Sequence, residues 1–322
     1  MKAIRVHETG GPEVLRIEEQ PEPTPGPDEL LLDVEAIGVN FIEIYQREGQ
    51  YRRPLPLTLG GEAAGVVRAI GSGVSEFKPG DRVVSQSVKG AYAERATVIA
   101  ERAVRIPDGV SSKQAAAVFL QGLTAHYLTT STFPLSRGDR ALVHAAAGGV
   151  GLLLCQMAKK RGAFVIGTAS TEEKRQLARD AGADEMIDYT TEDFAAAVRR
   201  ITNQVGVRVV YDSVGKTTFD KSLDSLARRG LMVLFGQSSG AVPPLDPQVL
   251  NRKGSLFLTR PMLNDYVATR DELLSRANDL FGWVASGELS VRIGAEYPLD
   301  KVADAHRALA SRETTGKVVL VP

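Results

Sequence analysis

The sequence predicts an α/β fold in which a doubly wound parallel sheet domain is joined to a mainly-β domain. Two patterns carry this prediction. From about residue 140 to 261, short apolar runs recur roughly every 22 to 24 residues with helical patterns between them, as in consecutive βα units. Before residue 110, strand-like runs are instead cut by proline-rich turns such as PEPTPGPDE and KPGD. A chain of 322 residues is long enough for two such cores.

Domain boundaries follow from this change of pattern. Residues 1–122 are expected to form the N-terminal part of the mainly-β domain, and 123–262 the parallel-sheet domain. Residues 263–322 contain a helical pattern and the strand-like ending GKVVLVP, so we expect them to return to the first domain. The segment 111–133 is rich in helix formers and is predicted to bridge the two halves.

Helix start and stop signals accompany the βα pattern. Ser170 and Glu173 have the spacing of a capping box, and Thr190 with Asp193 is a weaker analogue. Gly162, Gly182 and Gly230 stand where helices should end, so we expect all three to be C-cap glycines. Glycine is favoured at the end of a helix because the cap residue adopts a left-handed backbone conformation.

Composition argues against several classes of partner. The 39 basic and 39 acidic residues cancel, which disfavours nucleic acid and anionic membranes as natural partners. The N-terminus lacks the apolar core of a signal peptide and no apolar run is long enough for a membrane span, so we expect a cytoplasmic protein. A single cysteine, Cys155, and four scattered histidines predict no metal site.

The run HAAAGGVG follows an apolar strand and opens a leucine-rich helix. Ala146, Gly148 and Gly151 align with the glycines of the dinucleotide-binding fingerprint, at the first βα unit where a Rossmann fold carries it. Small residues let a pyrophosphate approach the amides at the helix N-terminus. The second strand ends without a carboxylate, whereas Ser170 and Lys174 could bind a 2′-phosphate, so NADPH is favoured over NADH.

These motifs, together with GGEAAGVVRAIGSGV, FKPGDRVV, VVYDSVG and LTRP, resemble the medium-chain dehydrogenase/reductase superfamily over the whole chain. The sequence is most similar to its zinc-free branch, the NADPH-dependent, zeta-crystallin-like quinone oxidoreductases. The resemblance implies a GroES-like first domain. Zinc-bearing members read GHE where this chain has Gly60-Gly61-Glu62, and have a ligand cysteine where it has Asn40. Hydride transfer to an electron-poor quinone, directly or through a semiquinone, therefore fits better than alcohol oxidation.

The resemblance also assigns site residues, and the source of the proton stays open. For the acceptor pocket it implies Asn40, Tyr45 and Tyr51 near the nicotinamide, with the tyrosines offering flat faces and hydroxyl donors. For the cofactor it implies Phe41, Tyr45, Tyr127, Gly148, Gly149, Val150, Ser170, Lys174, Tyr189, Ser213, Gly236, Gln237, Ser238, Ser239, Pro261, Leu263 and Arg312.

Two other functions remain open at this stage. An NADPH-dependent enone or enoyl-thioester reductase would use the same fold and cofactor, with a conjugated carbonyl compound as the acceptor. A non-enzymatic RNA-binding or structural, crystallin-like role is the alternative from another class. We also expect a homodimer, formed by pairing at a hydrophobic strand edge in LMVLFGQ or SLFLTRP.

Overall fold

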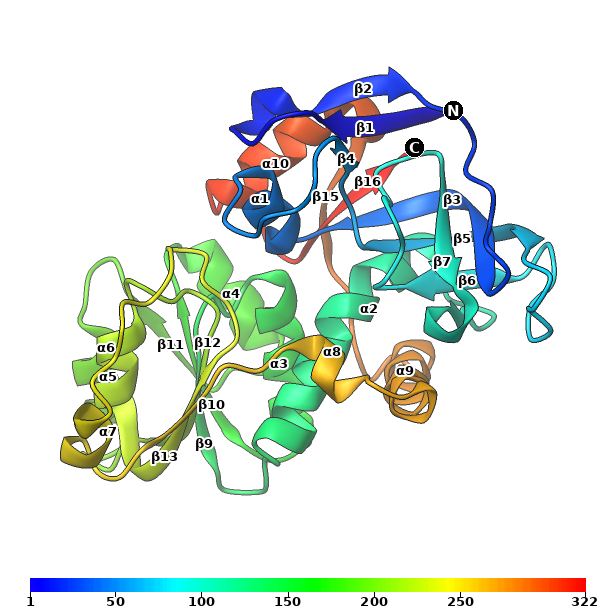
Figure 1. Cartoon of the computed structure of the whole chain (residues 1–322). Helices are drawn as coiled ribbons and strands as arrows, with labels where there is room; N and C mark the ends of the chain where they lie inside the picture. The colour runs from blue at the N-terminus through cyan, green and yellow to red at the C-terminus, as the bar shows by residue number, and fades with distance from the viewer. The chain divides into compact units, whose positions relative to one another are not determined.

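The computed structural model describes residues 1–322 and divides into two compact units (Figure 1). Unit 1 comprises Met1–Leu123 and Thr269–Pro322, and unit 2 comprises Thr124–Ala268. The predicted boundaries lie one residue (122 against 123) and six residues (262 against 268) earlier in the chain. The second difference has a local cause, because Tyr266 stacks on Tyr127 of the same unit with ring centroids 4.2 Å apart. No helix combines the length and the apolar character that crossing a bilayer requires.

Unit 1 is built on a seven-stranded sheet of order β15-β16-β3-β5-β6-β8, with β7 also paired to β3, and on a three-stranded sheet of order β2-β1-β4. The C-terminal strand β16 pairs antiparallel with β3, so the end of the chain completes the larger sheet. The strands are β1 (Lys2–Val6), β2 (Arg16–Glu19), β3 (Glu29–Val39), β4 (Leu57–Thr58), β5 (Glu62–Ile70), β6 (Arg82–Ser85), β7 (Arg95–Ile99), β8 (Val104–Arg105), β15 (Ile293–Pro298) and β16 (Lys317–Val321).

Four α-helices accompany these sheets. Helix α9 begins at a capping box in which the Thr269 hydroxyl accepts from the Glu272 amide at 3.2 Å. Helix α2 starts in unit 1 and ends in unit 2, and a π-helical turn continues it over Leu128–Thr132. The predicted bridge over 111–133 is therefore two segments. The helices are α1 (Phe41–Arg47), α2 (Ser112–Tyr127), α9 (Arg270–Ala285) and α10 (Val302–Ala310).

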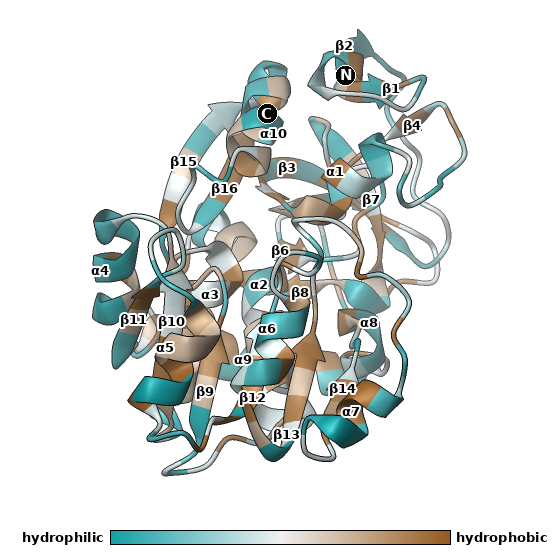
Figure 2. Cartoon of the chain, turned by 90° about the vertical axis from the view of Figure 1, so that its left-hand side faces the viewer, coloured by the Kyte–Doolittle hydropathy of each residue, from teal (hydrophilic) through white to brown (hydrophobic).

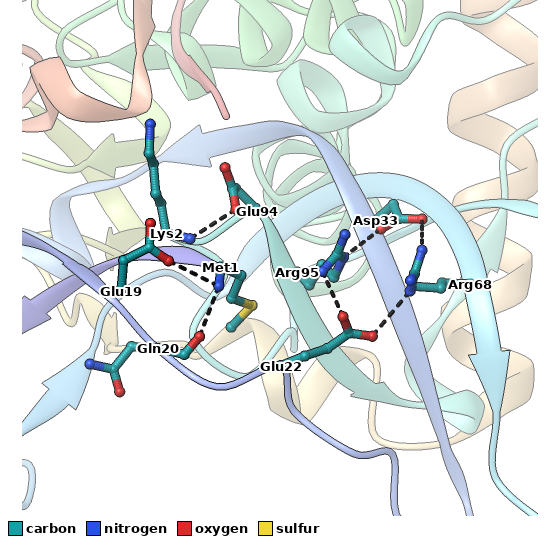
Figure 3. A network of polar contacts seen from close by, with 9 residues as sticks. All are labelled: Met1, Lys2, Glu19, Gln20, Glu22, Asp33, Arg68, Glu94 and Arg95. Atoms are coloured by element: carbon teal, nitrogen blue, oxygen red, sulfur yellow. Dashed lines mark hydrogen bonds and ion pairs between the residues drawn. The ribbon is translucent and has the colours of Figure 1, made fainter.

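A polar network joins the N-terminus to neighbouring strands of unit 1 (Figure 3). The α-amino group of Met1 pairs with Glu19 at 3.2 Å, and the Lys2 amide donates to Glu94 at 2.8 Å. Glu22 links two arginines of different strands, and those arginines also share Asp33. Because these ion pairs are largely exposed, each contributes little, and their main effect is to fix the position of the N-terminal segment. The arginines are Arg68 and Arg95.

Unit 2 is a six-stranded parallel sheet of order β11-β10-β9-β12-β13-β14. This is the doubly wound order of a Rossmann domain, with the strand order reversing at β9. Its strands are β9 (Arg140–Val143), β10 (Phe164–Ala169), β11 (Glu185–Asp188), β12 (Val207–Asp212), β13 (Leu226–Leu234) and β14 (Phe257–Thr259). Its helices are α3 (Gly149–Lys160), α4 (Glu172–Asp180), α5 (Phe194–Ile201), α6 (Phe219–Ser225), α7 (Gln248–Arg252) and α8 (Leu263–Tyr266).

Apolar side chains fill each unit separately. In unit 2, Leu142, Ile166 and Val210 are fully buried on neighbouring strands, and Figure 2 shows β9 and β12 largely in brown while α4 and α6 are teal. Parallel strands covered on both faces need such continuous apolar runs. Cys155 is also fully buried, and burial raises the pKa of its thiol to about 12.

Three local predictions are corrected by the structure. Gly230 is no helix cap, because it lies inside β13. The N-cap of α4 is Thr171, one residue after Ser170, and its hydroxyl accepts from the Lys174 amide at 3.3 Å. Helix α5 is capped by Asp193 itself. Capping preferences permit several neighbouring residues, and only the backbone geometry selects among them.

The structure also reduces the two runs predicted to form a free strand edge to one. Strand β13, which contains the LMVL run, lies between β12 and β14 and has no free edge. The terminal strand of the sheet is β14, where Phe257 is 60% exposed and Leu258 is 37% exposed. Only the SLFLTRP segment therefore offers unpaired backbone groups beside exposed apolar side chains.

Two glycines of unit 1 differ in the space around them, and this difference leads to a testable prediction. A Cβ at Gly65 would lie 2.1 Å from the Asp33 carbonyl oxygen, whereas nothing lies within 4 Å of one at Gly282 in α9. Gly65→Ala should therefore destabilise unit 1 by about 1–3 kcal/mol or more. Gly282→Ala should be stabilising by up to about 1 kcal/mol, because alanine favours a helix. Urea unfolding of both variants checks this; equal midpoints would contradict it.

Candidate active site

Helix α1 places the first group of predicted residues, and it starts at Asn40, directly after β3. The Asn40 amide nitrogen of the backbone donates to Glu43 Oε2 at 2.8 Å, which is one half of a capping box. The side chain of Asn40 turns inward: Oδ1 accepts from Lys317 Nζ at 2.7 Å, and Nδ2 donates to Gly38 and Glu62 oxygens at 3.1 and 3.2 Å. Both ends of this amide are therefore occupied within unit 1.

Lys317 and Glu62 form a buried ion pair beside Asn40. Their side chains are 1% and 0% exposed, and Nζ lies 2.6 Å from Glu62 Oε2. The other carboxylate oxygen of Glu62 accepts from the Leu120 amide at 2.7 Å. A Cβ at Gly38 would lie 2.1 Å from the Glu62 carboxylate, so only glycine lets the pair cross the strand there. Such a pair is tolerated in the interior because both charges are hydrogen-bonded.

This donor set does not fit a zinc ion. Asn40 and Gly61 offer no thiolate or imidazole, and no group of three or more histidine, cysteine or acidic side chains gathers anywhere in the molecule. The Asn40 and Glu62 oxygens already bind the Lys317 ammonium, whose positive charge would repel a metal cation at the same place. Zinc prefers four nitrogen or sulfur ligands, which these residues cannot supply.

Glu43 is the second buried carboxyl group of this cluster. Its Oε2 accepts from the Asn40 amide, and its Oε1 accepts from the Gly61 amide at 3.3 Å. Burial raises the pKa of Glu43 to about 7, although the Lys317 charge and hydrogen bonds from the backbone amides of Glu43 and Asn40 oppose that shift. The side chain thus exchanges a proton near neutral pH while it holds the start of α1 in place.

A second buried chain of polar contacts ties α1 to α10. Arg47 donates from Nη1 to His306 Nδ1 at 3.2 Å, and His306 Nε2 lies 3.0 Å from the Tyr92 hydroxyl. Because arginine can only donate, Nδ1 accepts and Nε2 carries the proton toward Tyr92. Burial first, and then the Arg47 charge, lower the pKa of His306 to about 3, so the ring is neutral.

Aromatic rings extend from the same helix. The rings of Phe41 and Tyr45 are 6.1 Å apart, and Tyr45 meets Tyr51 edge-on at 5.5 Å. Tyr45 is 9% exposed, whereas Tyr51 is 39% exposed. Asn40, Phe41, Tyr45 and Tyr51 therefore lie at the start of α1, on it and shortly after it, and the rings offer apolar faces and hydroxyl groups suited to a flat ring.

In unit 2, the predicted cofactor residues follow the carboxyl ends of parallel strands. Because all six strands run in one direction, these loops share one edge of the sheet, where open α/β sheets bind ligands. Gly148, Gly149 and Val150 follow β9 and are half-buried. Gly148 is the N-cap of α3, and no side chain caps this end of the helix. The others along this edge are Ser170 after β10, Tyr189 after β11, Ser213 after β12, Gly236, Gln237, Ser238 and Ser239 after β13, and Pro261 and Leu263 after β14.

The glycine turn is sterically suited to a phosphate. A Cβ at Gly151 would lie 2.2 Å from the Ala145 carbonyl oxygen, so the first turn of α3 can approach the strand only with glycine there. Ala145 has a φ of 50°, the left-handed conformation that makes the turn tight. The N-terminal amides of α3, a helix of 12 residues, are thereby offered to an anion.

Buried polar side chains hold the loops at this edge of the sheet by hydrogen bonds. One oxygen of the Asp212 carboxylate accepts from the Val214 and Gly215 amides at 2.7 and 3.0 Å, and the other accepts from Ser222 at 3.0 Å. His144 contacts Ser222 at 2.9 Å through Nε2. Since the Ser222 proton goes to Asp212, the His144 Nε2 proton goes to Ser222. The loops after β9 and β12 are thus fixed by one network.

The remaining predicted residues occupy less central positions. Lys174 lies in the first turn of α4 and is half-buried, Tyr189 is 43% exposed, and Tyr127 is buried against Tyr266. Burial raises the pKa of Tyr127 far above its ordinary value, so its hydroxyl keeps its proton. Arg312 follows α10 in unit 1 with a φ of 61°. It is not part of the edge described for unit 2.

Sequence reasoning missed the buried polar residues. Lys317 had a signal, because a charge opens the apolar run KVVLV, and Asp212 ends the strand VRVVYD. Glu62 stands in the GGE motif, which the sequence analysis compared only with the GHE motif of zinc-bearing members. His306 and Arg47 carry no signal, because their pairing joins segments 259 residues apart.

Comparisons with known proteins agree with this geometry. Residues 26–108 match the family model described as alcohol dehydrogenase GroES-like domain, and 149–273 match zinc-binding dehydrogenase. The chain is 48% identical to quinone oxidoreductase 1 of Escherichia coli and 41% identical to 2-haloacrylate reductase of a Burkholderia species, with 98–99% of each chain covered. A mycobacterial structure complexed with NADPH superposes with a TM-score of 0.98 at 52% identity, covering 100% of both chains.

Glu43 gives a testable pH dependence. A carboxyl whose folded pKa of about 7 exceeds its ordinary 4.5 adds stability that is complete below pH 4.5 and is lost as the pH rises through 7. Glu43→Gln keeps one acceptor oxygen, for one of the two backbone amides, and cannot titrate. The free energy of unfolding of the wild type should therefore fall by up to about 3 kcal/mol relative to the variant between pH 4.5 and 8. Parallel pH profiles in urea unfolding would refute this role.

Proposed function

Since the chain belongs to the quinone oxidoreductase family, we propose that it transfers a hydride from NADPH to a quinone. The observation that carries the proposal is the edge of unit 2, where a glycine turn and five further loops follow the carboxyl ends of parallel strands, the edge at which open α/β sheets bind dinucleotides. In unit 1, the aromatic rings and hydroxyl groups on α1 and in the segment after it suit a flat acceptor. Similarity to a mycobacterial structure complexed with NADPH supports the choice of cofactor.

Bound NADPH would supply the hydride from its nicotinamide ring, and the residues of the chain would bind and orient the reactants. The amides of Gly149 and Val150 would hold the pyrophosphate. Ser170 and Lys174 would hold the 2′-phosphate, because a hydroxyl and an ammonium group recognise that anion where a carboxylate would repel it. Ser213 and the segment 236–239 would line the same edge.

In this proposal, Asn40 is a positioning residue at the start of α1. Its amide is held by Lys317 and Glu62, so it keeps one orientation at the start of α1. Tyr45 and Tyr51 would contact the acceptor ring, and hydride transfer becomes fast when such contacts fix distance and angle. No step requires a metal, because an electron-poor quinone accepts hydride without a Lewis acid.

A second function has a specific observation in its favour. The chain is 41% identical to a 2-haloacrylate reductase over nearly the full length of both chains. An NADPH-dependent reductase of conjugated double bonds, acting on enones or enoyl thioesters, would use the same cofactor residues.

Turnover of a quinone panel against a matched panel of enones and haloacrylates, followed by loss of NADPH absorbance, tests both functions. We expect quinones to give the higher kcat/KM, with no loss after treatment with a chelator. Preference for the enones would replace the first function by the second, and sensitivity to the chelator would contradict metal-free transfer.

The cytoplasmic location expected from the sequence stays a prediction. Cell fractionation with detection of the protein in the soluble fraction would check it.

Cofactor selectivity depends on Lys174 in this proposal. Removing its positive charge in Lys174→Ala should weaken NADPH binding about tenfold or more while leaving NADH binding within about twofold. Lys160→Ala removes the same charge at the C-terminal end of α3, in the same unit, and serves as the control. Fluorescence titration with both cofactors measures this, and an unchanged preference for NADPH would disprove the assignment.

We further propose that two copies pair through β14. This strand is the edge of its sheet, and it carries exposed Phe257 and Leu258, with exposed Met262 close behind. Antiparallel pairing of two such edges about a two-fold axis satisfies the free backbone groups and covers the apolar side chains.

A charge at this edge should separate the copies. Phe257→Glu places two like charges near the axis, so its mass in light scattering should fall toward the 34.6 kDa of one chain, whereas the wild type should give twice that mass. A wild type that scatters as a single chain would rule out the pairing.

A further inference from the structure

The polar side chains around Asn40 are satisfied by one another, with one exception. Asn40, Glu43, Glu62 and Lys317 each have hydrogen-bond partners at 2.6–3.3 Å within unit 1. Gln86 is nine-tenths buried, yet neither Oε1 nor Nε2 of its side chain has a partner. A buried amide left unpaired on both sides has lost its hydrogen bonds to water without replacing them, so a partner that reaches it is favoured.

The position of Gln86 relates it to the same cluster. Strand β6 ends at Ser85, which pairs with Ala63 of β5, so the next residue lies beside Glu62 at the end of the sheet. The Gln86 carbonyl oxygen is 3.5 Å from the point where a Cβ of Gly61 would stand. The chain stays alongside β5 beyond this point, because the Val88 amide donates to the Gly61 carbonyl at 2.8 Å.

Gly61 has no side chain, and a Cβ there would meet the Gln86 carbonyl oxygen at 3.5 Å and Glu43 Oε1 at 4.0 Å. The Asn40 amide and the Lys317 ammonium are not free to donate to a ligand, because they are already bonded to Glu62 and to each other. Three rotatable bonds let the glutamine amide turn without any movement of the strand.

We propose that the side-chain amide of Gln86 binds the oxygen of the electron acceptor. Nε2 donates to the carbonyl oxygen of the oxidised acceptor, and Oε1 accepts from the hydroxyl group of the reduced product. An amide suits both, since it carries a donor and an acceptor on one rigid plane. The proposal deepens the quinone reductase function and rests on it.

A donor at this oxygen also aids the reaction. Hydride from NADPH places negative charge on the carbonyl oxygen, which then takes one proton from water to become the hydroxyl group of the product. A hydrogen bond that strengthens as this charge develops stabilises the transition state more than the ground state. Gln86 would thus affect kcat as well as the acceptor KM, and it would leave the affinity for NADPH unchanged.

Gln86→Met tests the proposal, because methionine matches the length of glutamine and lacks both hydrogen-bonding groups. We expect kcat/KM for a benzoquinone to fall about tenfold, with the NADPH dissociation constant within about twofold of wild type. Folding should be retained, because the variant removes an unpaired buried amide. Gln86→Glu, which keeps the size but loses the donor, provides a second variant should the first unfold, and is expected to lose at least as much. Gln248→Leu, a surface glutamine on α7, is the control.

A spectroscopic measurement separates binding from a merely structural role. With oxidised cofactor present to prevent turnover, the carbonyl stretch of carbon-13-labelled benzoquinone should shift to lower frequency on binding wild type and should lose that shift in Gln86→Met. Wild-type turnover with an unaltered shift and unaltered kinetics in the variants would overturn the role of Gln86 alone. Absence of NADPH-dependent quinone turnover in wild type would overturn the proposed function, and the role of Gln86 with it.

Discussion

The ion pair between Lys317 and Glu62 is the interaction on which the candidate site of unit 1 depends. It joins the last strand of the chain to β5, and through Asn40 it reaches the start of α1. Loss of one partner would leave a bare charge in the interior, at a cost of about 3–5 kcal/mol. The pair is tolerated because both charges are hydrogen-bonded: the ammonium also donates to Asn40, the carboxylate also accepts from a helix amide, and Gly38 leaves room for the crossing.

Both units use buried polar groups to hold loops that would otherwise move. In unit 1, Glu43 fixes the start of α1 and the glycine pair after β4, and His306 joins Arg47 to Tyr92. In unit 2, Asp212 and His144 fix the loops after two neighbouring strands. In each case a low-dielectric interior strengthens the hydrogen bonds, so the residues that face a ligand are positioned before it arrives.

The fold was largely predictable from sequence, whereas the chemistry beneath the site was not. All six strands of unit 2 coincide with apolar runs, because a parallel sheet covered on both faces needs them. The cap of α4 was misplaced by one residue, since Ser170 and Thr171 are chemically equivalent until the backbone chooses. Lys317 was missed because its partners lie 255 and 277 residues away, and no local period encodes such a separation.

The discontinuity of unit 1 has a consequence for the order of events during synthesis. Its sheet is completed only by β16, which leaves the ribosome after the whole of unit 2 has been made. Unit 2 is contiguous and contains its own core, so it can fold while the first 123 residues still wait for their closing strand. Until then Glu62 has no counter-charge, and the nascent first segment depends on water, or on a chaperone, to keep that carboxylate solvated.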